Sequence, residues 1–473
     1  MKKFLLFLCF IPSMVFAEIS LPSVFSDGMV LQQNAEVSIW GKADAGSAVT
    51  VEPSWLDNKI GAVADGEGNW KVKVKTGTAD FKPYSLTISQ KGSKVEISDI
   101  VFGEVWFCSG QSNMVMKMKG WYHAPVYGSR EAIANSTNNY IRIFDVPLGG
   151  AAEEKFTVKS KWQKAAPGSV YMASATAYFF GKQLFSTLNV PVALITAAYP
   201  GASIIAFMSK ESMKAYPQYK LPLPGDRRFG YRKPTGYYNA MVSPVVGYGI
   251  NGTIWYQGES DRNTPDLYRQ LFTSMLADWR AKWGMGDFPF IYAQIAPYNY
   301  GKETENSAYF REAQAKGAKE NKNAYMVSMT DIGEEHNIHP SEKKTAGFRL
   351  AAMALNKVYG IEGIYCDEPE YKSMTVENGK AVLSFENASG GLTSYGQTMT
   401  NFVIAGSDKV FYPATAVFRG NSIIVSSDKV PEPVAVRYAF TDFAKGCLYN
   451  IEGCCASSFR TDNWKESECK FVR

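Results

Sequence analysis

Histidine is the scarcest of the residues that could do chemistry in this chain. The sequence has 473 residues and only three histidines: His123, His336 and His339. No Cys-x-x-Cys pair with a histidine partner occurs, so the sequence gives no sign of a structural zinc site. After residue 17 no run of eighteen apolar residues follows, so we expect a soluble mature chain without a membrane span.

The sequence also lacks a large excess of positive or negative residues. Lys and Arg number 50 against 45 Asp and Glu, a net charge of +5, and this small balance argues against a nucleic-acid partner. The 46% of hydrophobic residues against 20% charged excludes a disordered or fibrous protein. There is no internal repeat and no low-complexity segment.

The N-terminus has the pattern of a signal peptide. Lys2 and Lys3 precede an apolar run from Phe4 to Val15, which is too short to span a bilayer, and Val15-Phe16-Ala17 resembles a cleavage site. We therefore predict a signal peptide over residues 1–17, cleavage near Ala17 and a periplasmic or secreted protein. The alternatives are a buried N-terminal helix or an uncleaved anchor.

Six cysteines remain after removal of the predicted signal peptide. An exported protein can form disulfides, and six cysteines allow 15 pairings, between which the sequence does not choose. Four of the six lie in the last 27 residues, which is compatible with a disulfide-linked C-terminal segment. We expect Cys108, in an apolar run, to be a buried free thiol in a strand.

The hydrophobic pattern divides the mature chain into three parts. Residues 18–100 and 361–473 contain short alternating strands with Gly-rich turns, which predict β-sandwich-like domains. Residues 101–360 alternate apolar strands with helical patterns, which predicts an α/β domain with a parallel sheet flanked by helices. The expected strands of that domain are Val101 to Cys108, Val190 to Ala197, Gly252 to Tyr256, Phe288 to Ile295 and Ala324 to Met329, and the expected helices are Ala173 to Leu188, Leu267 to Trp283 and Lys343 to Val358.

A candidate nucleophile and a candidate base follow strands of this sheet. Ser112 comes just after the strand that ends at Cys108, on a turn that exposes its hydroxyl, although a serine there is also a common helix N-cap. His339 precedes Pro340 at the predicted start of a helix, which holds the imidazole in place, and His336 is the second choice. His123 is expected to line a pocket or to be solvated.

Two further loops carry groups that could support a reaction at Ser112. Gln257 and Glu259 follow the strand that ends at Tyr256, where they could donate to an oxyanion or orient neighbouring groups. Gly201 offers an unhindered backbone N–H to a ligand. The alternative for Gln257 and Glu259 is a polar strand end without function.

Taken in order, these stretches resemble the sialate O-acetylesterase family, a branch of the SGNH/GDSL-type serine esterases. The similarity spans nearly the whole mature chain, and its first and third blocks are quite specific. The matching blocks are Glu104 to Met114, Gly201 to Ile204, Tyr237 to Met241, Trp255 to Asp261, Arg311 to Gln314, Ile338 to Pro340 with Gly347 to Ala351, and Ser458 to Asp462.

The resemblance implies an SGNH-type domain that removes acetyl groups from O-acetylated sugars, typically sialic acid, without a metal or other cofactor. By position, Ser112 would be the nucleophile and His339 the base. The N–H groups of Ser112 and Gly201 with the side chain of Gln257 would form the oxyanion hole. Glu259 would orient the site, and Asn239 would support it.

The sequence departs from the family pattern before His339. Related esterases often carry an aspartate two or three residues earlier, where this chain has Asn337 and His336. Asp331 and Glu335 lack the usual spacing, so either the acid comes from elsewhere or a backbone carbonyl orients a Ser–His dyad.

The sequence also does not decide which acetylated sugar is the substrate. The same machinery would accept acetyl-xylan or another polysaccharide ester, and a non-catalytic carbohydrate-binding protein is the alternative from another class. Four arginines could pair with a sialate carboxylate but could equally be surface charges: Arg227, Arg228, Arg232 and Arg262.

Overall fold

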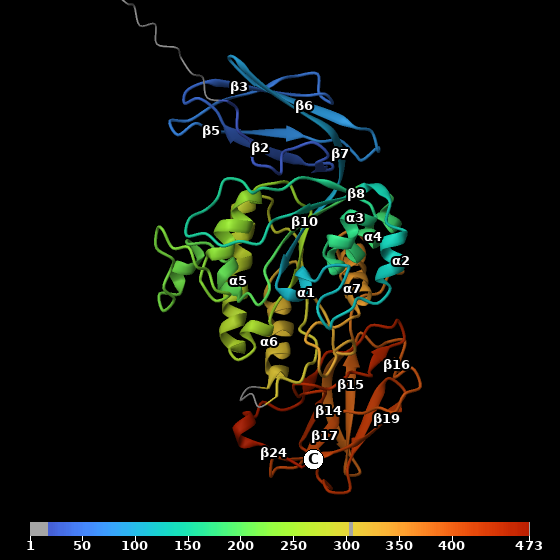
Figure 1. The fold of residues 1–473 in the computed structure, drawn as a ribbon. Coiled ribbons are helices and arrows are strands. Elements are labelled where there is room, and N and C mark those ends of the chain that lie inside the picture. The colour runs from blue at the N-terminus through green and yellow to red at the C-terminus, as the bar shows by residue number, and fades with distance from the viewer. Residues whose placement is uncertain (1–17, 302–305, 473) are drawn as a thin grey trace, which may run out of the picture.

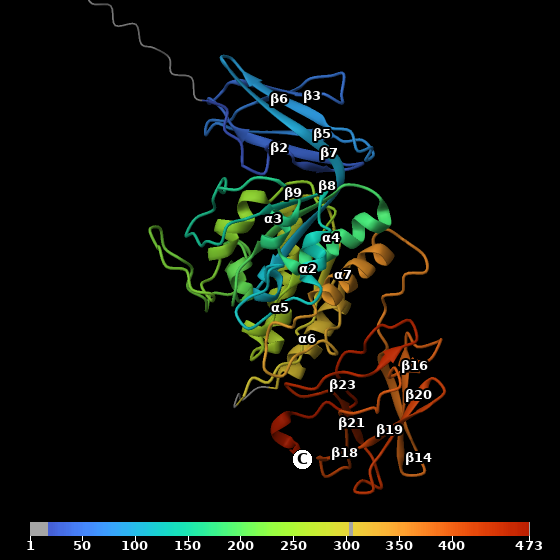
Figure 2. The ribbon, with the colours of Figure 1, turned by 45° about the vertical axis from the view of Figure 1, so that its right-hand side comes forward.

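The computed structural model describes residues 18–301 and 306–472, so the predicted signal peptide lies outside the described residues. Three parts follow one another along the molecule (Figures 1 and 2): a β-structure at the N-terminal end, an α/β body in the middle and a second β-structure at the C-terminal end. The expected α/β class with flanking β-structures is therefore confirmed.

One long strand, β7 (Ser93–Gly110), connects the N-terminal β-structure to the central sheet. Its first half pairs antiparallel with β6 (Tyr84–Gln90), and its second half lies parallel between two strands of the central sheet. The remaining strands of this part are β1 (Val30–Gln32), β2 (Glu36–Lys42), β3 (Ala48–Pro53), β4 (Ile60–Val63) and β5 (Asn69–Lys75). The sequence pattern divides the chain at residues 100 and 101, in the middle of this continuous strand.

The central sheet has the order β13-β12-β11-β7-β10-β8-β9, and its neighbours are parallel except for the pair β8 and β9. Its strands β10, β11 and β12 are buried throughout, which explains their continuous apolar sequences. The bounds are β8 (Asn138–Asp145), β9 (Gln163–Ala165), β10 (Val192–Ala198), β11 (Gly252–Tyr256), β12 (Phe290–Ala293) and β13 (Ala324–Val327).

Helices cover both faces of this sheet (Figure 1). On one face α4 (Ala175–Leu188) and α7 (Lys343–Lys357) pack with Trp106 of β7, and on the other α5 (Pro265–Trp283) and α6 (Ser307–Glu320) pack with Phe107. Successive strand residues point to opposite faces, so one strand supplies both cores. Shorter helical elements are α1 (Ser112–Val115), α2 (Ser129–Ala134), α3 (Pro167–Met172), η1 (Ile204–Phe207), η2 (Ser212–Ala215), η3 (Tyr238–Val242), η4 (Ser243–Val245), η5 (Glu259–Asp261) and η6 (Glu466–Glu468).

The C-terminal part consists of three small sheets. A four-stranded antiparallel sheet contains β14 (Glu370–Glu377), β15 (Lys380–Glu386), β20 (Ser422–Ser426) and β19 (Thr415–Arg419). A five-stranded sheet contains β23 (Phe459–Arg460), β21 (Ala435–Tyr438), β17 (Phe402–Ala405), β18 (Val410–Pro413) and β24 (Lys470–Phe471), and β16 (Leu392–Thr393) pairs with β22 (Tyr449–Asn450). All six cysteines of the described residues are free thiols, and Cys108 is buried in β7 as expected.

Helix α6 connects the central part to the C-terminal part through a buried arginine. The Arg311 guanidinium donates to the Ser458 hydroxyl at 3.0 Å and to the carbonyls of Ala439 and Thr441 at 3.1 and 2.6 Å. Arg460 and Glu312 form an ion pair of 2.9 Å alongside. Two blocks of the sequence resemblance, around Arg311 and around Ser458, therefore touch each other in the structure.

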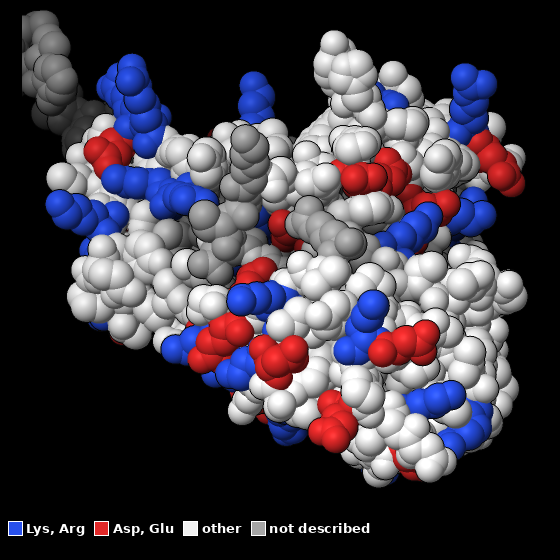
Figure 3. Space-filling view, turned by 90° about the horizontal axis from the view of Figure 1, so that it is seen from below, with Lys and Arg blue, Asp and Glu red and all other residues white. Residues whose placement is uncertain are grey.

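The face of the molecule seen from below carries charged side chains of both signs (Figure 3). In the view from below, acidic and basic residues are interspersed over the face shown (Figure 3). Such a face lacks the basic stripe that a nucleic-acid footprint needs.

Candidate active site

Ser112 begins α1 directly beyond the end of β7, on a turn that only glycine permits. Gly110 has a φ of +134°, and a Cβ at this position would lie 2.2 Å from the carbonyl oxygen of Tyr256. Next to it, the Gln111 N–H donates to that same oxygen at 2.9 Å. The chain therefore turns sharply against β11 and presents Ser112, which is largely buried, at the carboxyl edge of the sheet.

The loops after β10 and β11 end at the same edge. Ala198 and Tyr256, the last residues of these strands, are both in register with Gly110 of β7. The Tyr199 N–H donates to the Gly110 carbonyl at 3.0 Å. Gly201 and Gln257, which follow these strands, are thereby held in the loops on either side of the Ser112 turn.

Asn113 connects the Ser112 turn to the loop that carries His339. Its amide nitrogen donates to the Ile338 carbonyl at 3.1 Å, and its amide oxygen accepts from the Lys343 ammonium at 2.7 Å. Lys343 also donates to the Pro340 carbonyl at 2.7 Å. The carbonyl groups of the two residues that flank His339 are thus held by two side chains, and the structure brings the predicted nucleophile and base segments together.

The environment of His339 keeps its imidazole neutral. The ring is half-buried and meets Trp121 edge-to-face at 5.0 Å between centroids. Burial, aided by the nearby positive charge of Lys343, lowers the pKa of His339 to about 4. Burial lowers the pKa of Lys343 itself to about 7. At neutral pH the imidazole is therefore unprotonated, which is the form that a general base needs.

The carboxylates that lie near His339 in the sequence contact other residues. Asp331 makes a two-pronged ion pair with Arg349 at 2.6 and 2.7 Å. Glu335 is exposed, accepts a 3.4 Å hydrogen bond from the Asn299 amide and lies 3.9 Å from the His336 ring nitrogen. Among the described residues, no carboxylate or carbonyl forms a hydrogen bond with the His339 ring, so neither candidate acid completes a triad in this geometry.

Glu334 instead shapes the loop around His339. Its carboxylate accepts from the Ser341 N–H at 2.6 Å and from the Asn337 amide at 2.9 Å. The Asn337 side chain in turn accepts from the His339 N–H at 3.0 Å. The residue that replaces the usual aspartate therefore positions the backbone of His339.

Gln257 is placed beside the site, but its amide protons are already used. The amide nitrogen donates to the Ala202 carbonyl at 2.9 Å and to Asp261 at 2.6 Å. This arrangement ties the loop after β10 to the loop after β11, and it favours a structural role over the predicted oxyanion contact. The backbone N–H groups of Ser112 and Gly201 make no hydrogen bond within the described part of the chain, so both remain available to a ligand.

Glu259 is connected to the Ser112 turn through Asn113. It is buried and accepts from the Asn113 amide at 2.6 Å, and burial raises the pKa of its carboxyl group. Glu259, Asn113 and Lys343 therefore form one buried polar chain.

Asn239 and the other two histidines lie away from this chain. The Asn239 amide donates to the carbonyls of Ala151 and Ala152 at 3.1 and 2.9 Å and holds that loop. His123 is exposed, and its ring lies tilted against that of Tyr122 at 3.9 Å between centroids. The His336 side chain is 84% exposed, so neither histidine has the enclosed setting of His339.

Sequence reasoning missed the parts played by Asn113, Glu334 and Lys343. Asn113 lies inside the block around Ser112, and that position was its only signal. A lysine and a glutamate near a helix start look like surface charges, because burial cannot be read from a single sequence. The described residues contain no group of three His, Cys, Asp or Glu side chains that could hold a metal ion. They also contain no helix long and apolar enough to cross a membrane.

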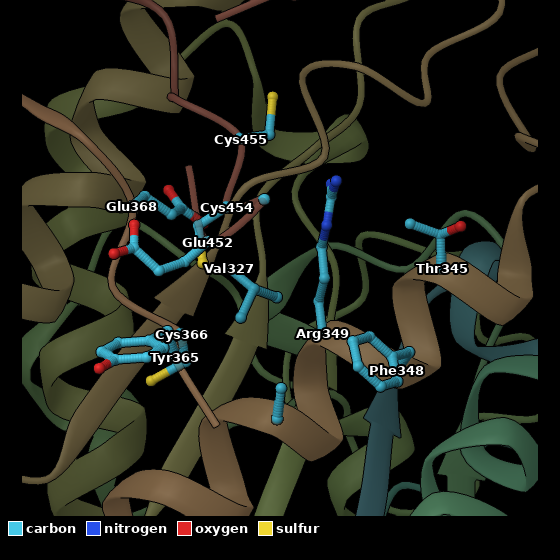
Figure 4. Close-up of a pocket in the computed structure, with 12 residues that line it drawn as sticks. Val327, Thr345, Phe348, Arg349, Tyr365, Cys366, Glu368, Glu452, Cys454 and Cys455 are labelled. Atoms are coloured by element: carbon cyan, nitrogen blue, oxygen red, sulfur yellow. The ribbon is translucent and has the colours of Figure 1, made fainter. Parts of the chain in front are cut away.

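A separate cavity lies between α7 and the C-terminal part (Figure 4). Arg349 enters it from α7, while Cys454 and Cys455 come from the C-terminal chain. Glu368 also lines it, and burial raises the pKa of that carboxyl group to about 8. None of the predicted site residues lines this cavity, so it is distinct from the Ser112 site.

A parallel α/β sheet with a serine, a neutral histidine and two available backbone N–H groups at its carboxyl edge is typical of serine-dependent ester hydrolases. The family model described as "Carbohydrate esterase, sialic acid-specific acetylesterase" matches residues 103–356, and the chain belongs to this family. The protein is accordingly a carboxylic ester hydrolase of the sialate O-acetylesterase type.

Individual relatives agree with this family. Human sialate O-acetylesterase is 28% identical over 384 residues, which cover 73% of this chain and 72% of the human protein. The mouse sialate O-acetylesterase is 26% identical over 434 residues, 77% of this chain and 78% of that protein. The crystal structure of a carbohydrate acetylesterase from Xanthomonas citri superposes with a TM-score of 0.84 at 31% identity, covering 94% of this chain and all of that one.

Proposed function

We propose that the protein removes O-acetyl groups from sugars, most of all from sialic acid, through an acetyl-enzyme on Ser112. The central observation is the Asn113 side chain, which joins the Ser112 turn to the Ile338 carbonyl next to His339. It supports a nucleophile and a base that act together. The proposal includes an SGNH-type central domain over residues 101–360, β domains over 18–100 and 361–473, and export after cleavage near Ala17.

The proposed reaction has two halves. The Ser112 hydroxyl attacks the acetyl carbonyl and gives its proton to neutral His339. The intermediate then collapses: the bond between the acetyl carbon and the sugar oxygen breaks, and His339 gives the proton to that oxygen, which leaves as the sugar hydroxyl. Water then gives a proton to His339 and attacks the acetyl group, and acetate leaves as His339 returns the proton to Ser112. The N–H groups of Ser112 and Gly201 are the proposed oxyanion donors, each contributing about 3 kcal/mol to the transition state. The roles of three further residues stay predictions: Gln257 as a third oxyanion donor, Glu259 as a group that orients the site, and Asn239 as a group that supports it.

Acetate release from an O-acetylated sialic acid tests the proposal. We expect Ser112→Ala and His339→Ala to fold normally and to lose nearly all activity, about 10³-fold or more. His336→Ala is the matched control, because this exposed histidine lies three positions away on the same loop. More than a few per cent of residual activity in Ser112→Ala would exclude Ser112 as the nucleophile.

Acetyl-xylan is the second substrate class to measure, since the same machinery would act on any small acyl ester of a sugar. The ratio of kcat/KM for acetylated sialic acid to that for acetylated xylo-oligosaccharides decides between them. 4-Nitrophenyl acetate reports on the catalytic groups without a sugar, and a protein that only binds carbohydrate would leave it intact.

A further inference from the structure

The segment around Tyr231 crosses the loop that carries Gly201. The Tyr231 carbonyl accepts from the Ser203 N–H at 2.8 Å. A Cβ placed on Gly201 would lie 3.8 Å from the Cβ of Tyr231, so this tyrosine stands directly beside the glycine. Its side chain is 55% exposed, which leaves ring surface open to a ligand next to Gly201.

Arg232 follows and is bound to the second loop of the site. Its guanidinium donates to the Ser260 carbonyl at 3.1 Å, and the Ser260 hydroxyl donates to the Gly201 carbonyl at 2.7 Å. Two hydrogen bonds therefore connect Arg232 to the glycine whose N–H is a proposed oxyanion donor. The residue is exposed, and its guanidinium carbon lies 5.8 Å from the centre of the Tyr231 ring.

The positive charge of Arg232 has no carboxylate within ion-pair distance among the described residues. Six other arginines of the chain do pair with acids, namely Arg142, Arg269, Arg349, Arg419, Arg437 and Arg460. The nearby Asp261 carboxylate already accepts from Ser203 at 2.5 Å, from the Ile204 N–H at 2.9 Å and from Gln257. A guanidinium has five N–H donors, and a single carbonyl contact leaves most of them available.

The other three arginines named from the sequence do not contact the loops around Gly201 in the way that Arg232 does. Arg262 packs its guanidinium on the Tyr300 ring at 4.0 Å and donates to the Glu259 carbonyl at 3.1 Å. Arg227 and Arg228 are exposed and make no hydrogen bond or ion pair within the described part of the chain. Of the four, Arg232 is the one joined to the Gly201 loop.

We propose that Arg232 is a specificity-determining residue, which binds the carboxylate of an acidic sugar substrate while the Tyr231 ring packs against the sugar. This inference rests on the proposed function and adds the residue that selects a charged sugar over a neutral one. Guanidinium and carboxylate match as a two-pronged pair, and an aromatic ring beside them suits the apolar face of a sugar.

The test compares an O-acetylated sialic acid with its carboxyl methyl ester, in which a methyl group removes the negative charge. The wild type should prefer the free acid in kcat/KM by about ten- to a hundredfold, the range of a hydrogen bond to a charged group. In Arg232→Gln this preference should fall to near one, mainly through a raised KM for the free acid. Arg232→Lys should be intermediate, because it keeps the charge and loses the planar fork.

Arg228→Gln is the matched control, since it removes an equal charge four positions away on the same segment and should keep the wild-type preference. An unchanged preference in Arg232→Gln, or an equal fall in both arginine variants, would overturn the inference and leave the proposed function intact. Wild-type enzyme that cleaves 4-nitrophenyl acetate but neither sialate ester would overturn the sialate substrate and this inference together. Melting temperatures of all variants show whether a loss comes from unfolding.

Discussion

At the scale of single residues, burial determines the chemistry of this site. Lys343 is a buried ammonium near the imidazole of His339, and both groups have a lowered pKa. Because the unfolded chain binds the histidine proton near pH 6.5 and the folded chain only near pH 4, this group makes stability fall as the pH falls through that window. The same lowered pKa keeps the His339 imidazole of the folded enzyme neutral at acidic pH.

Replacing Lys343 should move the pH dependence of activity. In Lys343→Met the positive charge is gone, so the pKa of His339 should rise and the acid limb of kcat/KM should shift to higher pH. Profiles with 4-nitrophenyl acetate from about pH 3 to about pH 8 measure the shift. The other ionisable groups that face Lys343 are Glu259, Glu334 and Tyr256.

The rate of Lys343→Met should also fall about tenfold, because Asn113 and the Pro340 carbonyl lose a hydrogen-bond donor. Lys343→Arg keeps the charge and should keep the midpoint of the acid limb near that of the wild type. A lower rate with an unchanged midpoint in Lys343→Met would show a structural role alone.

Gln257 gives a second prediction at this scale. In Gln257→Ala the Asp261 carboxylate and the Ala202 carbonyl each lose a donor, so we expect a stability loss of about 1–3 kcal/mol, measured as a lower Tm. Turnover of 4-nitrophenyl acetate should fall much less than the ~10²-fold expected from removal of an oxyanion donor. Ser203→Ala removes another donor of Asp261 and should behave alike. A hundredfold loss of kcat at normal Tm would make Gln257 an oxyanion donor after all.

At the scale of elements, the loop between β13 and α7 is rigid because both of its ends are tied down. Asp331 holds the beginning of the loop to Arg349 of α7, and Glu334 holds its middle to the Ser341 N–H. Lys343, at the start of α7, holds the Pro340 carbonyl. These contacts hold the backbone on which the His339 imidazole is carried.

Asp331→Asn should therefore lower the stability of the fold more than it lowers the catalytic rate. Its ion pair with Arg349 is mostly buried, so we expect a loss of about 2 kcal/mol or more in unfolding free energy. Activity should decrease far less than in His339→Ala. Glu335→Gln, an exposed neighbour, is the control and should change neither quantity much. A loss of activity in Asp331→Asn as deep as that of His339→Ala would establish a triad with Asp331.

At the scale of the whole molecule, one buried arginine forms an ion pair within the C-terminal part, and another joins that part to α6. Arg437 and Asp462 form an ion pair within that part, with both side chains at most 2% exposed. Arg311 reaches from α6 to Ser458 and to two carbonyls of the C-terminal chain. The contact between the two parts is therefore polar and specific.

Arg311→Met should weaken this contact. Several buried acceptors lose their donor, which we expect to cost about 3 kcal/mol or more and to separate an early unfolding transition of the C-terminal part in calorimetry. Arg269→Met on α5 breaks an exposed ion pair with Glu320 and should change stability by less than about 1 kcal/mol. Equal effects of the two substitutions would show that the Arg311 contacts do not join the parts.

The sequence by itself determined the features that depend on local pattern. Gly252 to Tyr256 forms a strand over the predicted residues, and α5 and α7 differ from the predicted helices by one or two residues at an end. These elements follow from hydrophobic periodicity, which is a short-range property. The α/β class and the family followed from the same strands and from the motifs at their ends.

Only the tertiary structure decided how those motifs meet. Asn113 and Ile338 are 225 positions apart, and the hydrogen bond between them depends on the order of the strands in the sheet. The same holds for buried Lys343, for Asp331 turned toward Arg349, and for Gln257 turned toward Asp261. The sequence gives the charge and size of each side chain, but its burial and its hydrogen-bond partners arise from long-range packing. Burial and partners determine the pKa of His339 and leave the Arg232 guanidinium available to a ligand.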